Sequence, residues 1–334
     1  MKQLEPWSAL RLLSATPLVG GLINATWRVG DPAVAVVQRL HPIFAPEVNL
    51  DIAAITAHVA DQGLVTPRVL QTDSGAWWAL DDQGACWRAL SWVPGVTHHK
   101  LEDPALAAQA GGLVARWHRA VAGLDHDFAF RRSGVHDTLA HLETLRAAVA
   151  DCSGHRLHDA VAPVADEILD RFDTWEGRLH GPEQLSHGDL KISNLRFDAQ
   201  GRGLCLLDLD TMGPLSLDLE LGDAWRSWCN PASEDAQETR FSVPLFEASA
   251  RAYLAERPLP AQEREALPGG IERICLELSA RFAADALREA YFGWDATVAP
   301  TRGDHHLLRA RGQLALARSV RSVRGALDRV LAGD

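Results

Sequence analysis

The sequence predicts an α+β fold of two lobes, a small antiparallel-sheet N-lobe and a larger helical C-lobe. Short strand-like runs and turn residues fill most of residues 1–93, whereas helical apolar patterns fill most of the remainder. Between the two regions, Val93-Pro94-Gly95 interrupts both patterns. We therefore expect a first lobe over residues 1–93 and a second over residues 94–334.

In the first lobe, the runs Thr26–Val29 and Val34–Leu40 have strand character and flank a turn at 30–32, which predicts a hairpin. A helix is expected next, because one face collects apolar residues before the chain reaches Gly63. That face carries Leu50, Ile52, Ile55 and Val59. Two further strands are expected around residues 77–80 and 85–92.

In the second lobe, Asp103-Pro104 predicts a helix start, with a capping carboxylate and a proline at the first helical position. The last long helix is expected to bury a stripe from Leu316 to Val330 and to leave its arginines in solvent. One polar loop, residues 186–196, interrupts this helical half and leads through a hairpin to Asp208. Loops of this kind often carry function.

Composition limits the classes of function. The 334 residues carry a net charge of −11, which argues against nucleic-acid binding because phosphate backbones attract basic surfaces. The five cysteines are scattered and odd in number, as in a reducing cytoplasm. No apolar stretch approaches the roughly 18 residues of a membrane span. We expect a soluble cytoplasmic protein with a small-molecule substrate and no nucleic-acid or membrane partner, either a monomer or a homodimer.

The polar loop reads His187-Gly188-Asp189-Leu190-Lys191-Ile192-Ser193-Asn194, and Asp208 follows fourteen residues later. Phosphoryl transfer needs a group that orients the attacking hydroxyl and oxygen ligands for Mg²⁺. Protein kinases place an Asp, an Asn five positions later and a metal-binding Asp after a strand in the same order. A surface turn and a helix cap would explain each feature alone but not all three together.

The pattern therefore predicts Asp189 as the catalytic base and Asn194 and Asp208 as metal ligands. Lys191, two positions after the base, is expected to help neutralise the phosphoryl group.

These motifs resemble the aminoglycoside phosphotransferase and choline kinase superfamily, and within it most closely the bacterial N-acetylhexosamine 1-kinases. Stretches along almost the whole chain carry the narrower resemblance: Gly21–Thr26, Val37–Leu40, Asp208–Thr211, Leu221–Arg226 and Leu307–Leu314. The resemblance implies a protein-kinase-like fold that binds ATP and Mg²⁺.

Residue by residue, the resemblance places Gly20, Gly21 and Asn24 over the phosphates of ATP. Arg39 stands where these kinases carry a phosphate-contacting lysine on the third strand, and no partner carboxylate is assigned to it. The backbone at Ala89, Leu90, Ser91 and Trp92 is expected to bind adenine. Substrate is expected at Thr211, Arg281 and Tyr291. Glu220 falls where the sugar kinases carry aspartate.

The implied activity is transfer of the terminal phosphoryl group of ATP to a sugar, most closely the anomeric hydroxyl of an N-acetylhexosamine. An aminoglycoside or amino-alcohol kinase is the alternative, although the mixed charge of residues 281–288 favours a neutral substrate. The missing lysine raises a third reading, a catalytically inactive nucleotide-binding scaffold. Retention of Asp189, Asn194 and Asp208 argues against it.

Overall fold

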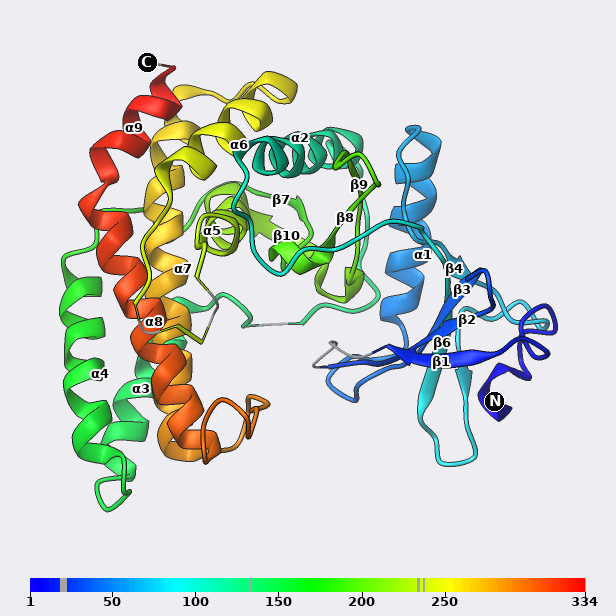
Figure 1. Ribbon diagram of the computed structural model, residues 1–334, viewed down its shortest axis with the longest axis horizontal. Coiled ribbons are helices and arrows are strands. Elements are labelled where there is room, and N and C mark those ends of the chain that lie inside the picture. Colours follow the sequence, from blue (N-terminus) through cyan, green and yellow to red (C-terminus); the bar gives the residue numbers. More distant parts are fainter. Residues whose placement is uncertain (19–22, 133, 233–234, 237, 334) are drawn as a thin grey trace. The chain divides into compact units, whose positions relative to one another are not determined.

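The computed structural model describes residues 1–18, 23–132, 134–232, 235–236 and 238–333 (Figure 1). The chain forms two compact units. The first comprises residues 1–97, 116–132 and 194–213, and the second comprises residues 98–115, 133–193 and 214–334. The hairpin that leads to Asp208 thus folds with the N-terminal sheet, although it follows the polar loop in sequence.

An antiparallel sheet forms the centre of the first unit, with strand order β1-β2-β3-β6-β4 and β5 paired to β6. The predicted hairpin is confirmed, since Val29 of β2 pairs with Ala35 of β3. The strands are β1 (Ala15–Leu18), β2 (Ala25–Val29), β3 (Ala35–Arg39), β4 (Val69–Leu70), β5 (Ala79–Leu80) and β6 (Cys86–Ser91).

The two faces of this sheet differ in character. One face packs the N-terminal segment, including Trp7 and Leu10, against Val37 and Trp87. The other face meets helix α1 (Val48–Asp61). The predicted α1 stripe is buried at Ile52, Ile55 and Val59, but Leu50 is 38% exposed, so that end of the stripe was wrongly assigned to the core.

Three further pieces complete the first unit. Strands β8 (Leu195–Phe197) and β9 (Gly203–Leu206) form a hairpin, and the 3-10 turn η3 (Leu209–Thr211) follows it. Helix α2 (Pro104–Val121) begins in the second unit and ends in the first. Its start is as predicted, because an Asp103 carboxylate oxygen accepts from the backbone N–H of Ala105 at 2.9 Å.

Helices dominate the second unit, where α7 lies among α3, α4, α5 and α8 (Figure 1). A short pair of strands, β7 (Glu183–Ser186) and β10 (Gly213–Ser216), leads into and follows the polar loop region, and the 3-10 turn η2 (Ile192–Asn194) is part of the loop itself. The helices are α3 (Thr138–Asp151), α4 (His158–Asp173), α5 (Leu217–Trp228), α6 (Val243–Glu256), α7 (Ala261–Arg288), α8 (Arg302–Ser322) and α9 (Arg324–Ala332). Among the described residues, none of the helices has the length and apolarity that a membrane crossing requires.

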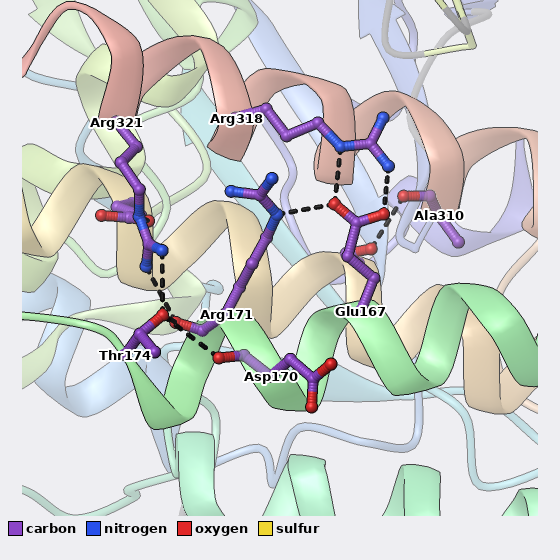
Figure 2. A network of polar contacts seen from close by, with 9 residues as sticks. Glu167, Asp170, Arg171, Thr174, Ala310, Arg318 and Arg321 are labelled. Atoms are coloured by element: carbon purple, nitrogen blue, oxygen red, sulfur yellow. Dashed lines mark hydrogen bonds and ion pairs between the residues drawn. The ribbon is translucent and has the colours of Figure 1, made fainter.

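The predicted last long helix is two helices, because the chain breaks at Val323 between α8 and α9. Its arginines are also not simply solvated. Figure 2 shows Glu167 of α4 accepting from Arg318 of α8 and from Arg171 of its own helix. Arg321 donates to Glu272 of α7 at 2.6 Å. Ion pairs, rather than water alone, satisfy this basic face.

Helices α5 and α7 approach each other through glycines. A Cβ at Gly222 would lie 2.7 Å from the backbone of Gly270, and a Cβ at Gly270 would overlap the carbonyl oxygen of Asp218. The two backbones therefore pack at a distance that no larger side chain allows. This contact fixes α5, which carries the residues that hold the polar loop.

All five cysteines are free thiols, and four of them are buried. Burial raises the pKa of Cys86 to about 11 and that of Cys205 to about 12. These thiols stay protonated at neutral pH and behave as small apolar side chains.

Candidate active site

The polar loop is attached to α5 by one buried carboxylate. Glu220 is 1% exposed, and its two carboxylate oxygens accept from the backbone N–H groups of His187 at 2.7 Å and Gly188 at 3.0 Å. Gly188 has φ +79°, a left-handed conformation that glycine adopts without a Cβ penalty. Glutamate thus clamps the start of the loop at the position where the resemblance implies aspartate.

Three more contacts fix the rest of the loop. The Nδ1 atom of His187 accepts from the N–H of Asp189 at 3.3 Å, so His187 braces the loop. From α5, Ser227 Oγ accepts from the N–H of Ile192 at 3.1 Å. Trp228 Nε1 donates to the carbonyl of Leu190 at 2.7 Å. The backbone on both sides of Asp189 is therefore held in place before any substrate binds.

Asp189 and Lys191 lie together in this loop. Lys191 Nζ donates to Asp189 Oδ2 at 2.7 Å, and the two side chains are 41% and 27% exposed, respectively. Burial alone would raise the pKa of Asp189, but the charge and hydrogen bond of Lys191 and, more weakly, the charge of Arg226 hold it below its ordinary value. Asp189 is therefore ionised at neutral pH, as a proton acceptor must be.

A cluster of charged side chains extends from Asp189 through the second unit. Arg226, whose charge acts on Asp189, donates to Asp223 Oδ1 at 2.8 Å. The charge of Asp223 in turn helps to raise the pKa of His136, whose Nδ1 lies 3.0 Å from Glu277 Oε1. Buried Glu277 also accepts from Thr138 at 2.6 Å. Each acid in this series is paired with a base.

The pKa of His136 is shifted by its acidic neighbours in this cluster. Burial alone would lower its pKa, but Glu277 and, more weakly, Asp223 raise it above the ordinary value for histidine. The acids of the cluster therefore favour the protonated form of His136.

The predicted metal ligands lie at one end of the β8–β9 hairpin in the first unit. The Asn194 carbonyl accepts from the N–H of Leu207 at 2.7 Å, which places Asn194 beside the strand end that precedes Asp208. Asp208 has φ 58° and ψ 62°, a left-handed backbone that is uncommon for residues other than glycine. An amide oxygen and a carboxylate suit a hard cation such as Mg²⁺. Their role as its ligands stays a prediction.

Asn24 lies in the first unit, but its side chain does not point to an open phosphate site. It is 7% exposed, donates to Asp210 Oδ2 at 2.7 Å and accepts from the N–H of His41 at 2.9 Å. Any phosphate contact from this position would come from its backbone. The other two predicted loop residues, Gly20 and Gly21, lie outside the described residues.

The placement of Arg39 does not fit the phosphate contact expected of it. Arg39 is exposed and shares the strand parity of Val37, which packs against the N-terminal segment. The neighbouring Gln38 faces the other way and accepts from Arg88 Nε at 2.8 Å. Strand alternation thus puts Gln38, not Arg39, on the face that α1 covers.

The predicted adenine-binding backbone is largely engaged within the sheet. Ala89 and Leu90 pair with β3 and β4. The N–H groups of Ser91 and Trp92 donate to the carbonyls of Arg68 and Val34. Adenine recognition here stays a prediction, and these two N–H groups are not available for it.

Of the predicted substrate residues, the structure brings two together. The Arg281 guanidinium lies 6.0 Å from the centroid of the Tyr291 ring and 4.0 Å from Glu277, which connects it to the charged cluster. The Tyr291 side chain is exposed. Thr211 belongs to the first unit, at the end of η3.

Comparison with known proteins agrees with this arrangement. The model of the phosphotransferase enzyme family matches residues 14–264. An aminoglycoside phosphotransferase from Alicyclobacillus acidocaldarius is similar, with a TM-score of 0.60, 17% identity and coverage of 96% of this chain and 95% of that one. A microcompartment-associated aminopropanol kinase is also similar, with a TM-score of 0.63, 17% identity and coverage of 98% of each chain. The amicoumacin kinase hAmiN, in complex with AMP-PNP, Ca²⁺ and Ami, has a TM-score of 0.63 and 14% identity, with coverage of 94% of this chain and 91% of that one. These likenesses confirm the predicted two-lobed, protein-kinase-like fold.

Proposed function

We propose, from the premise that this chain belongs to the phosphotransferase enzyme family, that it transfers the terminal phosphoryl group of ATP to a hydroxyl of a neutral sugar. The anomeric hydroxyl of an N-acetylhexosamine is the acceptor that the sequence resemblance favours. The observation that carries the proposal is the fixed, ionised carboxylate of Asp189 beside Lys191.

In this reaction, the acceptor oxygen attacks the γ-phosphorus while the bond from that phosphorus to the bridging oxygen of ADP breaks. The hydroxyl proton passes to Asp189. Lys191, 2.7 Å from that carboxylate, supplies positive charge next to the transferring group. Because α5 fixes the loop at several points, orientation of the hydroxyl requires no reorganisation of the loop.

Asn194 and Asp208 would hold Mg²⁺, which when bound neutralises charge on the β- and γ-phosphates. Their position at one end of the same hairpin supports this assignment. The nucleotide complex of the structurally similar hAmiN also contains a divalent cation.

Charge pairing supports an uncharged acceptor. The acids near Asp189 are matched within their own cluster, Asp223 by Arg226 and Glu277 by His136. A cationic amine would meet the positive charges of Arg226 and Arg281 along with these acids. A sugar hydroxyl instead needs only hydrogen-bond partners and brings no charge into this cluster.

An amino alcohol or an aminoglycoside is the second candidate acceptor. The similar solved structures include an aminopropanol kinase and an aminoglycoside phosphotransferase, which favours this class. The same Asp189 chemistry would serve it, so only the acceptor differs.

The test measures ADP release from Mg-ATP with a panel of free sugars, N-acetylhexosamines, choline, aminopropanol and kanamycin. We expect turnover on a neutral sugar, and a loss of about 10²–10⁴-fold in kcat for Asp189→Asn with nucleotide binding retained. Asp159→Asn, at a fully exposed position of α4, is the matched control and should keep full activity. Turnover on amines alone would overturn the sugar assignment, and full activity of Asp189→Asn would overturn the mechanism.

A further inference from the structure

A buried ion pair connects two parts of the first unit that are far apart in sequence. Arg88 of β6 is 1% exposed and Asp210 of η3 is 2% exposed. The guanidinium contacts both carboxylate oxygens, with Nη2 donating to Oδ2 at 2.8 Å and Nη1 donating to Oδ1. This fork-to-fork geometry fixes orientation as well as distance.

Neutral amides complete the shell around this pair. Gln38 accepts from Arg88 Nε at 2.8 Å and Asn49 accepts from Nη1 at 3.4 Å, while Asn24 donates to Asp210 Oδ2 at 2.7 Å. Residues before β2 and on β6 thus contact the Asp210 carboxylate, and residues on β3 and α1 contact the arginine that holds it. With its nitrogens engaged and its surface covered, Arg88 is built to hold Asp210 rather than to bind a ligand.

Asp210 lies two residues after Asp208, whose backbone is left-handed. An unfavourable backbone conformation of this kind persists when the surrounding structure over-determines it. Both oxygens of Asp210 are bound on the C-terminal side of Asp208, and the β8–β9 pairing holds the chain on the N-terminal side. The turn is therefore anchored at both ends.

Stability does not explain such a pair well. Removing two charges from water costs several kcal/mol each, and apolar replacements are often as stable. Arg88 is also close enough to Asp208 for the Asp208 charge to act on it. By its contacts to Asp210, the pair holds the turn that carries the Asp208 carboxylate.

We propose that Arg88 is a positioning residue which, through Asp210, holds the Asp208 turn in the conformation that binds Mg²⁺. This inference rests on the proposed function, because it takes Asp208 to be a metal ligand. Residues that orient metal ligands typically change metal affinity by about 10–100-fold when they are replaced. In this protein the charged pair of Arg88 and Asp210 would hold the Asp208 turn. The neutral side chains of Gln38 and Asn49 only support Arg88.

The experiment measures binding of AMP-PNP by calorimetry across a Mg²⁺ titration, together with thermal unfolding. We expect Arg88→Met to raise the half-saturating Mg²⁺ concentration about tenfold or more, with nucleotide binding without metal unchanged. The Mg²⁺ requirement of Arg88→Lys should fall between those of the wild type and Arg88→Met, because lysine keeps the charge but not the two-pronged contact of the guanidinium.

Arg88→Met leaves the Asp210 charge buried without its partner, which destabilises the fold, so the double variant Arg88→Met/Asp210→Asn decides the question. It contains no unpaired buried charge, and we expect its unfolding temperature to recover while its Mg²⁺ requirement stays raised. If the unfolding temperature and the Mg²⁺ requirement both return to the wild-type values, the proposal is overturned and the pair has only a structural role. Arg321→Met, which breaks the remote pair with Glu272, is the matched control and should lower stability without changing the Mg²⁺ requirement.

Asp208→Asn in the same titration separates this inference from the proposed function. If Asp208→Asn leaves the Mg²⁺ requirement unchanged, the metal assignment itself is wrong. If Asp208→Asn raises it and neither the Arg88 variants nor the double variant does, only the positioning role is wrong.

Discussion

Lys191 acts on the candidate base more directly than any other side chain in the loop. Its ammonium group contacts Asp189 at 2.7 Å and opposes the effect of burial on the pKa of that carboxyl. The reactivity of Asp189 therefore depends on a lysine two positions away, and pH can test that dependence.

Lys191→Met should raise the pKa of Asp189, since burial, which disfavours the charged form, then acts with less opposition. A base with a higher pKa is protonated at higher pH, so the acid limb of the kcat/KM profile should move to higher pH. The measurement is kcat/KM from about pH 4 to pH 9. An acid limb at the wild-type pH would show that Lys191 does not control Asp189.

Spacing within one stretch of sequence predicted the catalytic motif, whereas contacts between distant stretches were missed. Asp189, Asn194 and Asp208 follow a fixed local pattern, but Arg88 and Asp210 are 122 positions apart. An arginine inside the apolar run 85–92 was the available signal, because a buried charge needs a counter-charge. The parity of Val37 and Arg39 likewise predicts that both side chains lie on one face of β3.

Among the helices, α5 determines the geometry of the loop. Its Glu220, Ser227 and Trp228 all bind loop backbone, and its own position depends on the close glycine contact with α7. Sequence periodicity predicts helices of this kind but not which pair approaches most closely, because that depends on small residues meeting in three dimensions.

Gly270→Ala should therefore affect activity through packing. The added methyl group would overlap the Asp218 carbonyl and push α5 away, at a cost of about 1–3 kcal/mol in the free energy of unfolding. We expect lower kcat as well, since the loop moves with α5. Urea unfolding and initial rates test both effects.

Gly325→Ala in α9 is the control for that variant. A Cβ there meets only the Arg329 guanidinium, at 3.8 Å, so alanine should be neutral or stabilising. Equal stability of Gly270→Ala and wild type would contradict the close-packing argument.

For the molecule as a whole, ion pairs between helices make stability depend on pH. Arg318 and Arg171, by hydrogen bonding to Glu167, lower the pKa of Glu167 to about 2 from the ordinary 4.5 (Figure 2). A depressed carboxyl pKa stabilises the folded state above the unfolded-state pKa, and the contribution disappears as pH falls through the folded-state pKa. The window for Glu167 therefore runs from about pH 4.5 down to about pH 2.

Glu167→Gln should lower the free energy of unfolding by about 1 kcal/mol at pH 7, a value discounted for partial solvent screening. The difference from wild type should shrink as pH falls through that window. Urea unfolding at several pH values measures it, with Glu265→Gln at an exposed position of α7 as control. A difference that is the same at pH 7 and pH 2.5 would rule out the ion pairs as its source.

The left-handed backbone of Asp208 also determines how this protein could lose its activity. Asparagine and glycine tolerate that conformation, so Asp208→Asn and Asp208→Gly should fold about as well as the wild type while lacking the carboxylate. Asp208→Val, with its branched side chain, should be both inactive and unstable. A single base change in the gene could thus produce a folded but inactive nucleotide-binding protein, and such a variant would not be removed for misfolding.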